Sequence, residues 1–128
     1  MNKLDEALAA FDKAIKLNPH KSEAWDNKGN ALDDLGKHDE AIIAYDKAIE
    51  INPQKSDVWY YKGNALKELG NNDEAIKAYG KAIEINPQDS DAWCNKGLAL
   101  TKLNKYDEAR KAYNKAIEIN PQIRSGEQ

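Results

Sequence analysis

The chain has 128 residues, of which 41% are hydrophobic and 32% are charged, and these proportions are typical of a folded domain with one continuous core. Its formal net charge of −3 argues against nucleic acid or an anionic membrane as the main partner, because both attract clustered positive charge. The apolar runs are too short for a signal peptide or a membrane span, and the single Cys94 cannot form an internal disulfide. We therefore expect a cytoplasmic protein with one structural domain.

The first predicted element is a helix over residues 4–17, which ends before Pro19 because proline cannot continue a helix. Its apolar residues recur at helical spacing and form one stripe: Leu4, Leu8, Phe11 and Ile15. The same pattern returns in the second half of each segment that follows. Residues 1–21 are therefore predicted to be half of a repeating unit, and we expect the chain to be a fragment of a longer array or this helix to serve as a cap.

Three segments of 34 residues follow, over 22–55, 56–89 and 90–123, and each is predicted to form two helices. In the first segment, Ser22 is expected to cap a helix that ends at Gly36, and a second helix opens at Asp39 and ends at Pro53. Such units bury their apolar faces only against their neighbours. We predict an all-α solenoid, with a flexible tail over 124–128.

The repeated residues resemble the tetratricopeptide repeat. The family pattern is met in each segment by a tryptophan, a glycine, an alanine, a tyrosine and a proline, which in the first segment are Trp25, Gly29, Ala41, Tyr45 and Pro53. Two positions differ from the family pattern: Lys28 stands where leucine is usual, and Leu32 stands where tyrosine is usual. The resemblance implies a right-handed superhelix of antiparallel helix pairs over residues 1–123, whose first helices line a concave groove for an extended peptide or a helix.

The positions predicted to line this groove vary among the three repeats, whereas the packing positions do not. We interpret this as a fixed scaffold with an individual groove, although drift of solvent-facing positions is an equal alternative. The lining residues are Glu23, Asp26, Asn27, Asn30, Asp33 and Asp34 in the first repeat; Asp57, Tyr60, Tyr61, Asn64, Lys67 and Glu68 in the second; and Asp91, Cys94, Asn95, Leu98, Thr101 and Lys102 in the third.

The first repeat contributes four of the acids in this lining and no base. We therefore predict a protein or peptide partner with Lys or Arg facing the first repeat, and with an apolar anchor beside Tyr60, Tyr61 and Leu98. The asparagines are expected to offer their amides to a peptide backbone. Chaperone-binding members of the family use lysine, asparagine and arginine to hold a carboxylate, but the corresponding positions here are Asp26, Asn30, Tyr61, Asp91 and Asn95, so that role is not expected.

Two further hypotheses concern association and chemistry. The uncovered stripe of residues 4–17 could drive homo-oligomer or head-to-tail assembly, which is the alternative to a peptide-binding scaffold. His38, Asp39 and Glu40 lie at a predicted helix start, and Cys94 has no histidine nearby in the sequence. We therefore expect no enzyme activity, no cofactor and no metal site.

Overall fold

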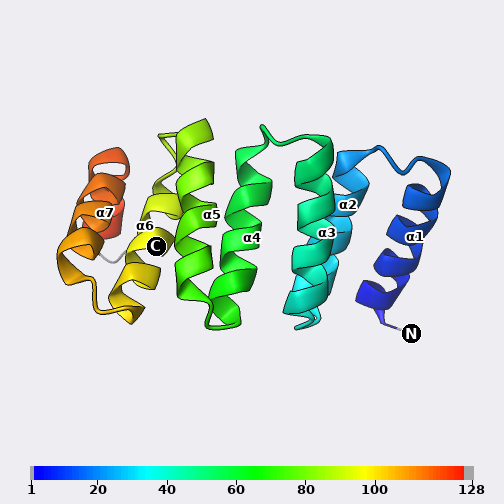
Figure 1. Cartoon of the computed structure of the whole chain (residues 1–128), viewed down its shortest axis with the longest axis horizontal. Coiled ribbons are helices and arrows are strands. Elements are labelled where there is room, and N and C mark those ends of the chain that lie inside the picture. Colours follow the sequence, from blue (N-terminus) through cyan, green and yellow to red (C-terminus); the bar gives the residue numbers. More distant parts are fainter. Residues whose placement is uncertain (1, 126–128) are drawn as a thin grey trace.

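The computed structural model describes residues 2–125, which form seven α-helices and one short 3-10 helix, without a strand in this range. The helices are α1 (Lys3–Leu17), α2 (Ser22–Asp34), α3 (His38–Ile51), α4 (Ser56–Glu68), α5 (Asn72–Ile85), α6 (Ser90–Lys102) and α7 (Tyr106–Ile119), followed by η1 (Pro121–Ser125). They stand side by side in chain order, from α1 at one end to α7 at the other (Figure 1). The predicted all-α solenoid is confirmed.

The turn inside each helix pair is the same in all three repeats. After α2, the N–H of Lys37 donates to the carbonyl oxygen of Leu32 at 2.9 Å, and Gly36 between them has a positive φ of 80°. This conformation suits glycine because it has no Cβ. Asn104 takes the glycine position in the third repeat and adopts a φ of 63°, which asparagine tolerates better than other residues.

The helix starts differ from the prediction in one detail. Ser22 was expected to precede its helix as the cap, but it is the first residue of α2, and Lys21 holds the cap position without a side-chain hydrogen bond. The N–H of Ala24 bonds to the carbonyl oxygen of Lys21 at 3.2 Å, so the first turn already includes Ser22. In the third repeat the side chain of Asp89 does cap α6, by accepting from the N–H of Ala92 at 3.1 Å.

Each pair of helices packs closely where a glycine faces a tyrosine. Tyr45 on α3 is buried, and a Cβ placed on Gly29 of α2 would lie only 2.6 Å from its Cε1 atom. The tryptophan of each repeat is half-buried, and the indole nitrogen of Trp25 donates to the carbonyl oxygen of Pro19 at 3.0 Å. The expected packing of a small residue against a large one is therefore present, and the indole ties the helix pair to the preceding linker.

One apolar side chain per repeat joins neighbouring units. Ile42 on α3 packs against the buried cluster of the second repeat, and Ile76 on α5 packs against that of the third. Leu8 of α1 makes the equivalent contact with the first repeat. Arg110 holds this position in α7, where it is exposed and pairs with Asp107 at 3.5 Å.

The first two residues of the predicted flexible tail, 124–125, lie at the end of the short 3-10 helix. Residues 121–125 form η1, which packs against α7. Residues 126–128 lie outside the described residues. Within residues 2–125 no helix is both long and apolar enough to cross a membrane.

Candidate peptide-binding groove

The first helix of each repeat lies on the inner side of the solenoid. Helix α2 approaches α4, and α4 approaches α6, whereas within the described residues no Cα atom of one of α3, α5 and α7 lies within 8 Å of a Cα atom of another. The second helices are therefore spread apart and the first helices are drawn together, which is the arrangement of a curved array with α2, α4 and α6 on its concave side. We call the predicted lining positions on these helices the inner face.

The first repeat places its acids on this face in different environments. Asp26 is only 7% exposed, and its Oδ1 atom is buried without a hydrogen-bond partner. Burial raises the pKa of Asp26 to about 6, the negative charge of Asp57 acts in the same direction, and the positive charge of Lys55 opposes them. Glu23, Asp34 and Asp57 are exposed, so the helical pattern alone did not distinguish Asp26 from its neighbours.

Asp33 has a partner that the sequence analysis missed. Its Oδ1 atom pairs with Nδ1 of His38 across the turn between α2 and α3. The sequence pattern places His38 at a helix start and assigns it no partner. The sequence did contain a signal for this pair. Asp33 and His38 are five residues apart around the Gly36 turn, and this turn brings their side chains together.

A hydrogen-bonded network joins the second and third repeats on the inner face. The Nδ2 group of Asn95 donates to the hydroxyl oxygen of Tyr60 and to Oδ1 of Asn64, both at 3.0 Å. The hydroxyl of Tyr79 also donates to Oδ1 of Asn64. Both acceptor positions of the Asn64 oxygen are therefore occupied within the chain, and in the first repeat the oxygen of Asn30 similarly accepts from the hydroxyl of Tyr45 at 2.7 Å.

Aromatic rings gather at the centre of the inner face. The ring of Tyr61 stacks on that of Tyr45 with centroids 6.2 Å apart, and it lies 5.8 Å from the ring of Tyr60. Tyr60 in turn lies 5.9 Å from Tyr79. Tyr60 and Tyr61 are half-buried, and Leu98 is 41% exposed. The two tyrosines and the leucine predicted as an apolar anchor thus come from two adjacent inner helices.

The remaining predicted residues show no reactive chemistry. Cys94 is half-buried and unpaired, and burial raises the pKa of its thiol, which lowers its fraction of nucleophilic thiolate at neutral pH. Among residues 2–125, no three His, Cys, Asp or Glu side chains lie close enough together to hold a metal ion. The other positions of the lining are half-buried at Lys67 and Thr101, and exposed at Asn27, Glu68, Asp91 and Lys102.

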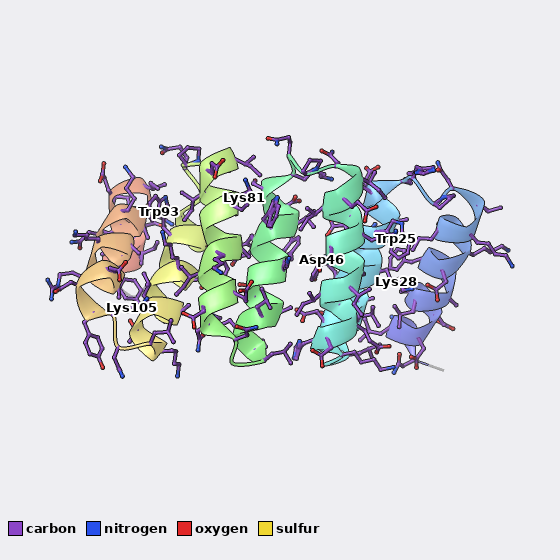
Figure 2. The ribbon with its side chains drawn as sticks, viewed as in Figure 1. Trp25, Lys28, Asp46, Lys81, Trp93 and Lys105 are labelled. Atoms are coloured by element: carbon purple, nitrogen blue, oxygen red, sulfur yellow. The ribbon has the colours of Figure 1, made fainter. Side chains whose placement is uncertain are left out.

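The opposite side of the inner helices carries a repeated lysine arrangement. Lys28 Nζ lies 5.5 Å from the centre of the Trp25 ring and 2.8 Å from Oδ1 of Asp12 on the preceding helix. Lys62 pairs in the same way with Asp46 at 2.7 Å. Figure 2 shows Trp25 and Lys28 near each other between α1 and α2, and Asp46 on α3. The lysine stems therefore lie along the helix pairs as expected, with their charges paired between repeats.

The apolar stripe of α1 is partly covered. Leu4, Leu8, Phe11 and Ile15 are all half-buried, and Leu8 contributes to the packing of the first repeat. The most exposed large apolar residue is Leu17, which is 80% exposed and was not among the predicted association residues.

The comparisons agree with this geometry. Family models described as tetratricopeptide repeat or TPR repeat match residues 1–56, 44–77, 63–103 and 90–123. No curated protein matches the sequence. Two structures titled "Crystal structure of MamA" and "Crystal structure of MamA protein" are similar, with TM-scores of 0.89 and 0.88 and identities of 29% and 30%; they cover 92% and 98% of this chain, and 69% and 68% of theirs.

A third similar structure is titled "First TPR of Spaghetti (RPAP3) bound to HSP90 peptide SRMEEVD". It is 29% identical with a TM-score of 0.77, and the match covers 79% of this chain and 80% of that one. Consecutive family matches, the repeated glycine and tyrosine contact and these solved relatives all lead to one conclusion. The chain belongs to the tetratricopeptide-repeat family.

Proposed function

We propose that the chain is a protein-interaction scaffold whose inner face binds a basic, extended peptide or helix of another protein. The observation that carries this proposal is the combination on one face of exposed acids with the half-buried rings of Tyr60 and Tyr61. Partly exposed aromatic rings are typical anchors of protein interfaces, and acids around them favour a partner of opposite charge. A related structure with a bound peptide supports a peptide as the ligand class.

The charge of the inner face is unfavourable for the peptide that is named in that structure. The peptide named there, SRMEEVD, contains three acidic residues. Here Asp26, Asp57 and Asp91 lie on the inner face, and like charges at an interface oppose binding. We therefore expect the acidic peptide to bind poorly and its basic counterpart to bind well.

The test compares three peptides of equal length by calorimetry at low and physiological salt. They are SRMEEVD, an amidated version with lysine at the three acidic positions, and an amidated version with glutamine or asparagine there. The lysine peptide should bind most tightly, and its advantage should shrink as salt increases because exposed charges are screened. Equal affinities of the three peptides at low salt contradict the proposal.

A matched pair of variants locates the binding face. Asp57→Lys with Asp91→Lys reverses two exposed charges on the inner face, whereas Asp39→Lys with Asp73→Lys reverses two exposed charges at the starts of α3 and α5. Both pairs change the net charge equally. Only the first pair should abolish the preference for the lysine peptide; equal effects of the two pairs would show that net charge alone attracts the peptide.

Self-association is a second candidate function, because α1 contains no buried residue and Leu17 at its end is 80% exposed. An exposed apolar residue next to a half-buried stripe favours contact with another copy. The mass in solution should then increase with concentration, and Leu17→Ser should reduce that increase without disturbing the packing of Leu8. A monomeric mass over the whole concentration range contradicts this candidate.

A further inference from the structure

The junction of the first and second repeats contains a carboxylate that the chain leaves without a partner. Asp26 is buried to more than nine-tenths, and its Oδ1 atom accepts no hydrogen bond. None of the ion pairs of residues 2–125 includes Asp26. A buried carboxylate without a donor is costly, and such residues are found where function compensates for the loss of stability.

At the junction of the second and third repeats, the equivalent position has a hydrogen-bond partner. Tyr60 occupies the position equivalent to Asp26, and Asn95 on the following helix donates to its hydroxyl oxygen at 3.0 Å. The same amide group donates to Asn64, and none of Tyr60, Asn64 and Asn95 has a buried side-chain polar atom without a partner. The second junction therefore needs no ligand to complete it.

Two differences in sequence leave the first junction incomplete: Asp26 stands in place of Tyr60, and Tyr61 in place of Asn95. The position of Asn95 is occupied there by Tyr61, whose ring stacks on Tyr45 and which has no amide to donate. No group of the described chain donates a hydrogen bond to Oδ1 of Asp26, although Lys55 lies close enough to affect its pKa, so a partner can supply the donor. Asp26 keeps a small exposed part, 7% of the residue, through which a group of a partner can approach its carboxylate.

We propose that Asp26 anchors one ammonium or guanidinium group of the partner, a lysine or arginine side chain that enters the inner face between the first and second repeats beside Tyr61. This inference rests on the proposed function of the inner face. The cation supplies the missing N–H donor, and the ring of Tyr61 offers an aromatic surface for the apolar stem. A metal ion fits less well, since no three suitable ligands converge here.

Binding of the partner's cation by Asp26 depends on pH, because the neighbouring groups shift the pKa of this carboxylate. Asp57 and Tyr61 face it from α4, Tyr45 from α3, and Lys55 from the loop before α4. Burial and the charge of Asp57 raise the pKa of Asp26 to about 6 in the free chain, with Lys55 opposing them. A bound cation favours the ionised carboxylate and lowers this pKa. Affinity for the cation is therefore highest above pH 6, and falls by up to about tenfold for each pH unit below it.

The experiment measures binding of the amidated lysine peptide at pH 7 and pH 5 to the wild type, Asp26→Asn and Asp57→Asn, with Asp39→Asn on the outer part of α3 as control. Wild type should lose about tenfold in affinity between the two pH values. Asp26→Asn should bind more weakly at pH 7 and show no such loss. Asp57→Asn should weaken binding in a salt-dependent way but keep the pH dependence, and Asp39→Asn should match the wild type.

The outcomes separate this inference from the proposed function. If the wild type prefers the lysine peptide but Asp26→Asn and Asp57→Asn behave alike, the anchor is refuted, and the proposal of an acidic inner face that binds a basic peptide stands. If the wild type shows no preference, both are refuted. Carbon NMR of the Asp26 carboxyl group gives an independent readout: a free-state pKa near 6 that falls on adding the peptide supports the anchor, whereas a free-state pKa below 4 would show that Lys55 already fills the site.

Discussion

Replacement of Gly63 by alanine tests the packing inside each helix pair. A Cβ at Gly63 would lie 2.6 Å from Cε1 and 2.7 Å from Cδ1 of Tyr79, about 1 Å closer than the optimal separation of carbon atoms, roughly 3.5–4.0 Å. Tyr79 cannot easily move aside, because it is 0% exposed and its hydroxyl is bonded to Asn64. Such overpacking costs about 1–3 kcal/mol.

Gly80 provides the matched control for this substitution. It also lies within a helix, α5, but a Cβ placed on it would meet nothing within 4 Å beyond its chain neighbours and the nearby backbone of its own helix. Alanine should therefore stabilise the chain at this position by about 0.5–1 kcal/mol, since glycine weakens a helix interior by that amount. The same helix-propensity gain applies to Gly63→Ala, so the difference between the two variants isolates the overpacking cost.

The assay is urea denaturation followed by helical circular dichroism, with equal m-values as a check that both variants unfold from a similar native state. Gly63→Ala should have a lower free energy of unfolding than Gly80→Ala by about 1–3 kcal/mol. If Gly63→Ala is as stable as Gly80→Ala, the close contact with Tyr79 is absent in solution, and the account of helix packing is refuted.

Three other substitutions have defined outcomes in the same assay. Gly80→Asp should restore the carboxylate that the other repeats provide for the equivalent lysine, and in a double-mutant cycle it should couple to Lys96 by about 0.2–1 kcal/mol; zero coupling contradicts the pairing. Asp26→Asn should stabilise the chain by up to about 3 kcal/mol at pH 7. Because the folded-state pKa is raised, wild-type Asp26 favours folding below pH 3.8 and loses this contribution as the pH rises through about 6, so the gain must vanish at pH 3. Tyr45→Phe should cost about 0.5–1.5 kcal/mol through loss of its hydrogen bond to α2, and an unchanged stability would show that this bond contributes nothing.

The fold was predictable from the sequence because its determinants are local and repeated. The prolines and the apolar spacing of each helix recur every 34 residues, two of the three turns share a glycine, and α1 begins at Lys3, within one residue of the predicted start. The facing of Gly29 and Tyr45 also follows from the need of two helices to approach closely.

The details of the inner face were not predictable, because they depend on distances between helices that are far apart in the sequence. A helical wheel places Asp26 on a solvated face, but the approach of α4 buries it. The approach of α6 to α4 also brings Asn95 to Asn64, so the Asn95 amide that is expected to offer hydrogen bonds to a peptide bonds within the chain. The pair of Asp33 with His38 depends on the shape of the turn, which helical periodicity does not describe.

The most direct test of the central claim is amide and indole NMR of the labelled chain as the amidated lysine peptide is added. The account predicts shifts at inner-face residues of α2, α4 and α6, largest around Asn27, Tyr61 and Leu98. The indole signals of Trp25 and Trp93 should stay unchanged, because these N–H groups bond to Pro19 and Pro87 away from that face. Shifts confined to the indoles, or to α1, would contradict a peptide-binding inner face.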